Sequence, residues 1–254
     1  MIPPYYKILG GQRFRMANNI YYDAHGRCVS ADRRFKAIGF DMDGTLLDTA
    51  IDYEKLGNAE AYVLSGLGVP SDVLSSACDD IDMIRKGVAY LNGHGNDITF
   101  DEACRMVNQR ASDVEMEAVE TAHCFPGVPE LLDELRSKGY RIGLLTRGQR
   151  LYAESAMGRC GILDRMDAVE AFDDHPTGEQ KPNPVAMGHL AKVLGVASKD
   201  IIYIGDSVWD YHCARDSGAG FIGIAHGENG HRKWERVKDS VELIENISEL
   251  IGRF

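Results

Sequence analysis

Short apolar segments alternate with helical segments along most of this chain. The segments that predict buried strands are Phe35–Phe40, Arg141–Leu145, Ile201–Ile204 and Phe221–Ile224, with a weaker one at Ala168–Phe172. Between them, Pro129–Lys138 and Pro184–Leu194 have apolar residues at helical spacing, and each is followed by a glycine, which commonly ends a helix. Strands that alternate with helices of this length form right-handed βαβ units. The sequence therefore predicts an α/β fold built on a parallel sheet.

A helical insert interrupts this alternation after the first strand. The stretch from about residue 50 to 122 has no convincing strand, and its apolar residues recur at helical spacing. Thr99 and Glu102 have the spacing of a capping box at a helix start. Gly87, Gly93 and Gly95 predict a loop within the insert.

The first 34 residues predict a small β-rich appendage of two hairpins. The paired segments are Tyr6–Leu9 with Gln12–Met16, and Asn19–Tyr22 with Arg27–Val29. The predicted organisation is thus an appendage at 1–34, a core at 35–49 and 123–254, and a helical domain at 50–122.

Charge and composition exclude several classes of partner. The net charge of −11 argues against a general affinity for nucleic acid or for an anionic membrane. No long uncharged apolar stretch predicts a membrane span. The six cysteines lie far apart without a CxxC pair, which is typical of reduced thiols, so we expect a cytoplasmic protein. The oligomeric state stays open.

Two carboxylates follow the first predicted strand at a spacing of two residues. The segment Phe40–Asp48 reads FDMDGTLLD, so Asp41 and Asp43 lie where a buried strand ends. Side chains at this edge of a parallel sheet converge on a ligand crevice. Like charges this close require a shared proton or a cation between them. The alternative is a turn in which Asp41 or Asp43 caps backbone N–H groups.

Further polar groups follow the other predicted strands. Thr146 ends the second strand, Lys181 precedes a helix that starts with proline, and Asp206 and Asp210 lie one helical turn apart. Each alone has a structural alternative, such as a helix N-cap for Thr146 or a solvated charge for Lys181. Together the strand ends supply four acids, a hydroxyl and a cation. That combination suits a divalent cation bound through oxygen, with a phosphate held between the metal and Lys181.

In this order, the four segments resemble the motifs of the haloacid dehalogenase-like phosphohydrolases, in particular their phosphoglycolate phosphatase-like members with a helical cap. The family motifs are DxDGT, a strand ending in Ser or Thr, a Lys often in KPxP, and GDSxxD. The match covers roughly residues 36–226 and leaves 1–34 unexplained. The resemblance implies a Rossmann-like parallel sheet with the first motif on a central strand, and it makes the insert a cap domain.

The resemblance also implies a mechanism. Asp41 would attack phosphorus and form an aspartyl-phosphate. Asp43 would protonate the leaving oxygen and then deprotonate the hydrolytic water. Mg²⁺ would be held by the Asp41 carboxylate, the Asp43 backbone carbonyl and Asp206. Asp210 would assist through water or by orienting Lys181.

Phosphate binding falls to residues from three motifs in this resemblance. Thr146 and Lys181 would hold the phosphoryl oxygens, and Gly44 and Thr45 lie in the turn that would surround the phosphate. Arg147 departs from the family, whose capped phosphatases commonly have Asn there. Its guanidinium binds a second anionic group of the substrate or points to solvent.

We expect a Mg²⁺-dependent phosphatase that acts on a small phosphorylated metabolite. Family dehalogenases lack an acid at the position of Asp43, because a halide leaves without a proton. A sugar-phosphate mutase on the same scaffold and a non-catalytic phosphate-binding scaffold protein are the alternatives. Substrate contacts in the insert are harder to assign, and His94 in a glycine-containing loop is the sharpest candidate. No spacing typical of metal ligands is evident among the remaining histidines, which include His123, His175, His189, His212, His226 and His231.

Overall fold

The computed structural model describes residues 35–78, 80–176 and 178–254, together with four short strands in the first 34 residues. The chain divides into two compact units, one of Met1–Asp48 with His123–Phe254 and one of Thr49–Ala122. Within the described residues, no helix combines the length and the apolar character needed to cross a membrane.

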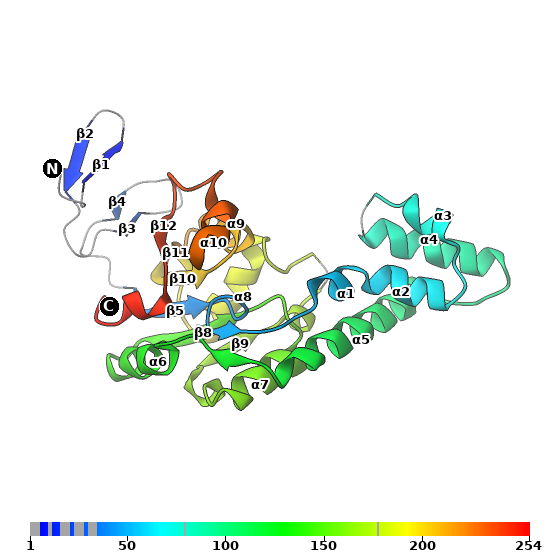
Figure 1. Ribbon diagram of the computed structural model, residues 1–254, viewed down its shortest axis with the longest axis horizontal. Coiled ribbons are helices and arrows are strands. Elements are labelled where there is room, and N and C mark those ends of the chain that lie inside the picture. Colours follow the sequence, from blue (N-terminus) through cyan, green and yellow to red (C-terminus); the bar gives the residue numbers. More distant parts are fainter. Residues whose placement is uncertain are drawn as a thin grey trace. The chain divides into compact units, whose positions relative to one another are not determined.

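The first unit is built on a six-stranded sheet in the order β12-β11-β10-β5-β8-β9 (Figure 1). The strands are β5 (Ala37–Phe40), β8 (Arg141–Leu145), β9 (Ala168–Glu170), β10 (Ile201–Gly205), β11 (Gly220–Ile224) and β12 (Glu242–Ile244). Every pairing in this sheet is parallel, which confirms the predicted α/β class. The strand that carries the first motif, β5, lies between β10 and β8 and is therefore central. The short edge strand β12 was not predicted.

Helices join these strands, as the alternating pattern predicts. They are α6 (Val128–Ser137), α7 (Arg150–Arg159), α8 (Pro184–Leu194), α9 (Val208–Ser217) and α10 (Gly227–Trp234), with short turns η1 (Leu163–Arg165), η2 (Phe172–Asp174), η3 (Ser198–Asp200) and η4 (Ile247–Leu250). Leu190 of α8 and Cys213 of α9 share one apolar cluster with Tyr203 of β10, so both helices cover the same face of the sheet.

The insert leaves and re-enters the first unit through a two-stranded ribbon. Strand β6 (Leu47–Asp48) pairs antiparallel with β7 (His123–Cys124). Leu47 lies opposite Cys124, and Asp48 lies opposite His123. The second unit can therefore be inserted without disturbing the parallel sheet.

The second unit consists of helices, with no strand among its described residues. They are α1 (Tyr53–Gly57), α2 (Ala59–Gly66), α3 (Ser71–Ser75), α4 (Asp80–Gly93) and α5 (Phe100–Val119). The predicted capping box is present, because the Glu102 N–H donates to Thr99 Oγ1 and the Thr99 N–H donates to Glu102 Oε2. The prediction of a loop at Gly87 is wrong. Gly87 lies within α4, where a Cβ would approach Leu64 Cδ2 to 2.7 Å, so glycine permits close helix packing.

The described strands of the first 34 residues form two antiparallel pairs, as predicted. Strand β1 (Tyr6–Leu9) pairs with β2 (Gln12–Arg15), and β3 (Tyr21–Tyr22) pairs with β4 (Cys28–Val29). The predicted strand ends at Met16, Asn19 and Arg27 lie outside the described residues.

Two strand glycines allow α8 to approach the sheet closely. A Cβ at Gly143 of β8 would lie 2.6 Å from Leu190 Cδ1 and 3.0 Å from Leu194 Cδ1. A Cβ at Gly39 of β5 would lie 2.7 Å from Tyr203 Cδ2 and 3.3 Å from Leu190 Cδ2. These contacts fix the distance between α8 and the two strands that end at the candidate site.

Gly143→Ala should destabilise the protein, because the added methyl group overpacks the space under Leu190, at a cost of about 1–3 kcal/mol. Urea denaturation measures this loss. Gly188→Ala is the matched control, since Gly188 lies in α8 with nothing within 4 Å of an added Cβ. The control should stabilise the helix by about 0.5–1 kcal/mol. Equal effects of the two substitutions would contradict the packing argument.

Candidate active site

The turn after β5 is tightly wound around one carbonyl group. The N–H groups of Thr45, Leu46 and Leu47 all donate to the Met42 carbonyl oxygen, at 3.2, 2.9 and 2.9 Å. Gly44 has a φ of 77°, and a Cβ there would lie 2.6 Å from Asp206 Oδ2. Glycine is therefore required at this position both by the backbone conformation and by the close approach of the loop after β10.

Lys181 connects two acids, Asp41 after β5 and Asp210 within α9, and also contacts Tyr203 of β10. Its Nζ donates to Asp41 Oδ1 and to Asp210 Oδ1, both at 2.6 Å, and to Tyr203 Oη at 2.9 Å. Tyr203 Oη in turn donates to the Leu145 carbonyl oxygen at 2.6 Å. The Lys181 side chain is only 2% exposed, so it is a buried cation and not a solvated surface charge.

Three carboxylates meet beside this lysine. Asp41, Asp206 and Asp210 each place one oxygen within 4.8 Å of the others, which is close enough for them to hold a metal ion. Asp210 Oδ2 accepts from the Ser207 hydroxyl and N–H, while its Oδ1 accepts from Lys181. Asp210 thus contacts Lys181 directly, and its role in orienting Lys181 stays a prediction. Asp206 Oδ2 accepts from Lys233 Nζ at 2.6 Å, a contact that the sequence did not predict.

Burial and mutual repulsion disfavour the ionised forms of the acids in this cluster. Burial raises the pKa of Asp41 well above its ordinary value; Lys181 opposes this effect, and Asp210 and Asp206 add to it. Burial also raises the pKa of Asp206 despite Lys233. For Lys181, burial alone would lower the pKa of the ammonium, but Asp210 and Asp41 outweigh burial and raise it. An additional cation would relieve the repulsion among the acids.

Two threonines present hydroxyl groups in buried positions. Thr146 is buried, and its N–H donates to the Glu170 carbonyl oxygen at 3.0 Å while its Oγ1 accepts from the Gly148 N–H at 2.9 Å. Thr45 is fully buried, and its Oγ1 has no hydrogen-bond partner among the described residues. An unsatisfied buried hydroxyl is costly, so the Thr45 hydroxyl fits a site that receives an anionic ligand.

Asp43 has a partner that sequence reasoning missed. Tyr152 of α7 is fully buried, and its Oη donates to Asp43 Oδ1 at 2.6 Å. Space for this ring depends on Gly148, where a Cβ would lie 2.9 Å from Tyr152 Cδ1. The sequence places Tyr152 shortly after Thr146, but nothing in the sequence indicates which side chain the Tyr152 hydroxyl would contact.

Arg147 and His226 complete the surroundings of the motif residues. The Arg147 guanidinium carbon lies 3.9 Å from the ring centroid of Trp209, whose side chain is exposed. Arg147 is also exposed, and its guanidinium stacks on the Trp209 ring. His226 approaches the Gly44 carbonyl oxygen with Nε2 at 3.1 Å and stacks on Phe125. Sequence reasoning assigned no role to His226.

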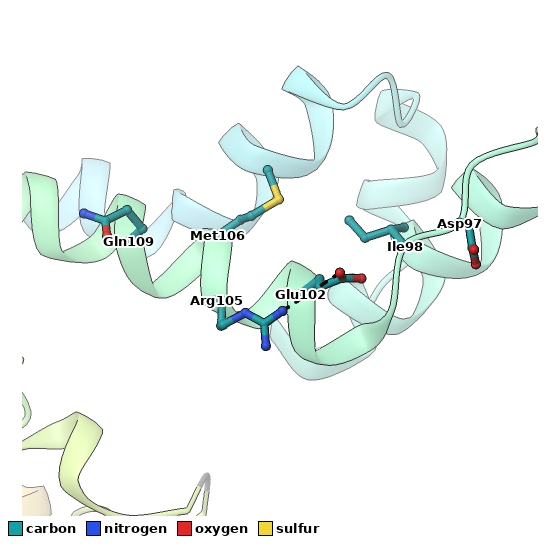
Figure 2. A pocket seen from close by; sticks show the side chains of 6 residues that line it. All are labelled: Asp97, Ile98, Glu102, Arg105, Met106 and Gln109. Carbon is teal, nitrogen blue, oxygen red and sulfur yellow. Dashed lines mark ion pairs between the residues drawn. The ribbon is translucent and has the colours of Figure 1, made fainter.

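The candidate residues of the helical unit have local partners. His94 Nδ1 lies 2.8 Å from the Tyr90 carbonyl oxygen, and the His94 ring stacks on that of Tyr90. A shallow pocket of about 450 Å³ lies in the same unit (Figure 2). Its lining residues are Asp97, Ile98, Glu102, Arg105, Met106 and Gln109. Figure 2 shows Arg105 turned toward Glu102, with which it forms an ion pair at 4.0 Å. None of the predicted catalytic residues lines this pocket.

Comparisons with known proteins bear on this arrangement. A model of the family described as haloacid dehalogenase-like hydrolase matches residues 35–218. A phosphoglycolate phosphatase of Vibrio parahaemolyticus is 26% identical over 223 residues, covering 85% of this chain and 94% of that protein. An N-acetylmuramic acid 6-phosphate phosphatase of Pseudomonas aeruginosa is 31% identical over 207 residues, covering 76% of this chain and 83% of that protein. The crystal structure of a hydrolase from Pseudomonas syringae has a similar fold, with a TM-score of 0.59 at 21% identity over 85% of this chain and 96% of that one.

Asp41→Asn should not destabilise the protein in the presence of a chelator, whereas Asp210→Asn should. Asp41→Asn removes one of three crowded acids and leaves Lys181 paired with Asp210. Asp210→Asn weakens a buried ion pair and a helix cap, and should cost about 3–5 kcal/mol. Thermal and urea unfolding measure both effects.

The sign of the pH dependence provides a second check. Because the folded-state pKa of Asp41 lies above its unfolded-state value, ionisation of Asp41 favours unfolding. Any stability gained by Asp41→Asn should be absent below the unfolded-state pKa and should grow as the pH rises toward the folded-state pKa. A loss at neutral pH as large as that of Asp210→Asn would contradict this account.

Proposed function

This chain belongs to the haloacid dehalogenase-like hydrolase family, and on that premise we propose that it is a Mg²⁺-dependent phosphatase for a small phosphorylated metabolite. The observation that carries the proposal is Lys181, buried between Asp41 and Asp210 beside a third acid. The phosphatase relatives from Vibrio parahaemolyticus and Pseudomonas aeruginosa support the same reaction class.

The acid cluster fits a hard divalent cation. Its donors are carboxylate oxygens, which Mg²⁺ prefers, and a cation bound there would favour the ionised forms of Asp41 and Asp206, which burial disfavours. The Asp41 and Asp206 carboxylates would hold the ion together with the Asp43 carbonyl oxygen, and Asp210 would orient Lys181. When bound, the ion supplies positive charge that lowers the repulsion between an anionic nucleophile and an anionic phosphoryl group.

The protein's own residues carry out the two steps of the proposed reaction. In the first, an Asp41 carboxylate oxygen forms a bond to phosphorus while the bond to the leaving oxygen breaks, and Asp43 donates a proton to that oxygen. In the second, Asp43 takes a proton from water, whose oxygen then attacks phosphorus and releases Asp41. The hydrogen bond from Tyr152 holds the Asp43 carboxyl in one orientation throughout.

Phosphate binding is assigned to residues of three of the motifs. Lys181 Nζ already contacts Asp41, so it would lie beside the phosphoryl group during attack. The Thr45 hydroxyl would gain the partner that it otherwise lacks, and Thr146 and the backbone at Gly44 would complete the phosphate site. Arg147, stacked on Trp209, would contact a second anionic group of the substrate. We propose residues 50–122 as the cap domain that selects the substrate.

Release of inorganic phosphate from a panel of phosphorylated metabolites tests the proposal. The panel includes phosphoglycolate and N-acetylmuramic acid 6-phosphate, after which the relatives are named. Activity should need Mg²⁺ and disappear with chelator. Asp41→Asn should lower kcat by about a thousandfold or more, and Asp43→Asn by about 10²–10⁴-fold.

Lys238→Ala is a suitable control, because Lys238 is exposed and forms a surface ion pair with Glu235. Activity that survives in Asp41→Asn would overturn the assignment of the nucleophile. Isomer formation without net phosphate release would identify a mutase, and binding of Mg²⁺ and phosphate without turnover would identify a non-catalytic protein.

Tyr152→Phe should shift the pH profile. The Tyr152 hydroxyl stabilises the ionised form of Asp43, and hydrogen bonds to charged groups contribute about 1.5–3 kcal/mol. Its loss should remove this stabilisation, so the limb of the profile that reports Asp43 should move to higher pH. Tyr140→Phe is the control and should leave the profile in place. An unchanged profile in Tyr152→Phe would show that this contact does not affect Asp43.

A further inference from the structure

A second cluster of titratable side chains lies on the segment between β9 and α8, apart from the acid cluster. Glu170 ends β9, and its side chain is only 8% exposed. His175 follows the η2 turn, Glu179 lies four residues further on, and His189 lies on α8. Nitrogen and oxygen donors that are distant in sequence are thereby brought together on one side of the first unit.

The donor atoms of this cluster converge. His175, Glu179 and His189 each place one donor atom within 4.8 Å of the others. His189 Nε2 lies 2.7 Å from Glu179 Oε2, and His175 Nε2 is hydrogen-bonded to Glu170 Oε2. The two imidazole rings stack with their centroids 3.7 Å apart and their planes 7° apart. Each ring therefore points one nitrogen at a carboxylate oxygen.

A ring nitrogen and a carboxylate oxygen that face each other are linked either by a proton on the nitrogen or by a metal ion. Two separate N–H groups, one on each neutral ring, would make two independent hydrogen bonds. A divalent cation can instead be shared where several donor atoms converge, because imidazole binds a metal as the neutral ring. The convergence of both histidines on the same carboxylate favours a shared cation over two separate pairs.

We propose that His175, Glu179 and His189 bind a divalent transition-metal ion of the Zn²⁺ class, with Glu170 as the hydrogen-bond partner that orients His175. Two imidazoles and one carboxylate form a ligand set that Zn²⁺ uses in proteins. The acid cluster at Asp41 offers only oxygen, which suits Mg²⁺. The two clusters are thus chemically distinct and select different ions.

The metal would tie the segment that carries Lys181 to the sheet and to α8. Glu179 lies two residues before Lys181, and Gln180 Nε2 already donates to the carbonyl oxygens of Phe172 and His175 at 3.0 Å. A shared ion would link this segment to α8 at one point, and the contact of His175 with Glu170 would connect that point to β9. The ligands do not include any residue of the proposed phosphatase reaction.

Metal binding by the full-length protein tests the proposal without any measurement of activity. The background variant carries Asp41→Asn and Asp206→Asn, which disable the acid cluster. A calorimetric titration with Zn²⁺ alone should show one equivalent bound. Addition of Co²⁺ alone should give the visible absorption bands of a low-coordinate site. His189→Gln in this background should weaken Zn²⁺ binding by at least about tenfold and abolish the bands.

The controls separate a site from adventitious binding. His231→Gln removes a comparable histidine, which pairs with Glu245 at 2.6 Å outside the cluster, and should leave the titration unchanged. Glu179→Gln is the second test variant if His189→Gln fails to fold, as judged by circular dichroism. Failure of the background protein to bind Zn²⁺ would overturn the proposal. Equal binding by the Glu179→Gln or His189→Gln protein would also overturn it, whatever the outcome of the phosphatase assay.

Discussion

The candidate site depends on one buried lysine. Lys181 lies between Asp41 and Asp210 and also contacts Tyr203, so it connects β5, β10 and α9 through charged and polar contacts. Burying an ion pair is costly unless each charge has good partners. Here burial raises the pKa of Asp41, and the neighbouring acids Asp210 and Asp206 add to this effect while Lys181 opposes it. Three acids beside one buried lysine form a site that is suited to bind a metal cation and, next to that cation, an anionic substrate.

Local sequence signals accounted for the sheet and for the acid cluster. The α/β class, the resemblance to haloacid dehalogenase-like hydrolases and the phosphatase class are confirmed by the parallel sheet, the family match and the relatives. Asp41, Thr146 and Asp206 could be placed near one another because the carboxyl ends of parallel strands share one edge. Their catalytic roles stay predictions. The prediction of a loop at Gly87 was wrong because a glycine that allows close helix packing looks, in sequence, like one that lies in a loop.

The contacts that could not be predicted depend on the direction in which long side chains point, and not on the order of the strands. Tyr152 reaches Asp43, and Lys233 reaches Asp206, across 109 and 27 residues respectively. His175 and His189 were dismissed because no short metal-binding spacing links them, yet the turn before α8 brings their rings into contact. Periodicity indicates which face of an element is buried, but it does not indicate where the tip of a long polar side chain ends.

The paired strands β6 and β7 have a consequence for how such a chain can diversify. Asp48 and His123 are neighbours across this ribbon, so the point where the chain departs and the point where it returns are adjacent. A segment of any length whose own ends lie close together could be grafted at this junction, and the catalytic scaffold would need no compensating change. The ribbon therefore lets the inserted unit vary while the parallel sheet and the acid cluster stay as they are.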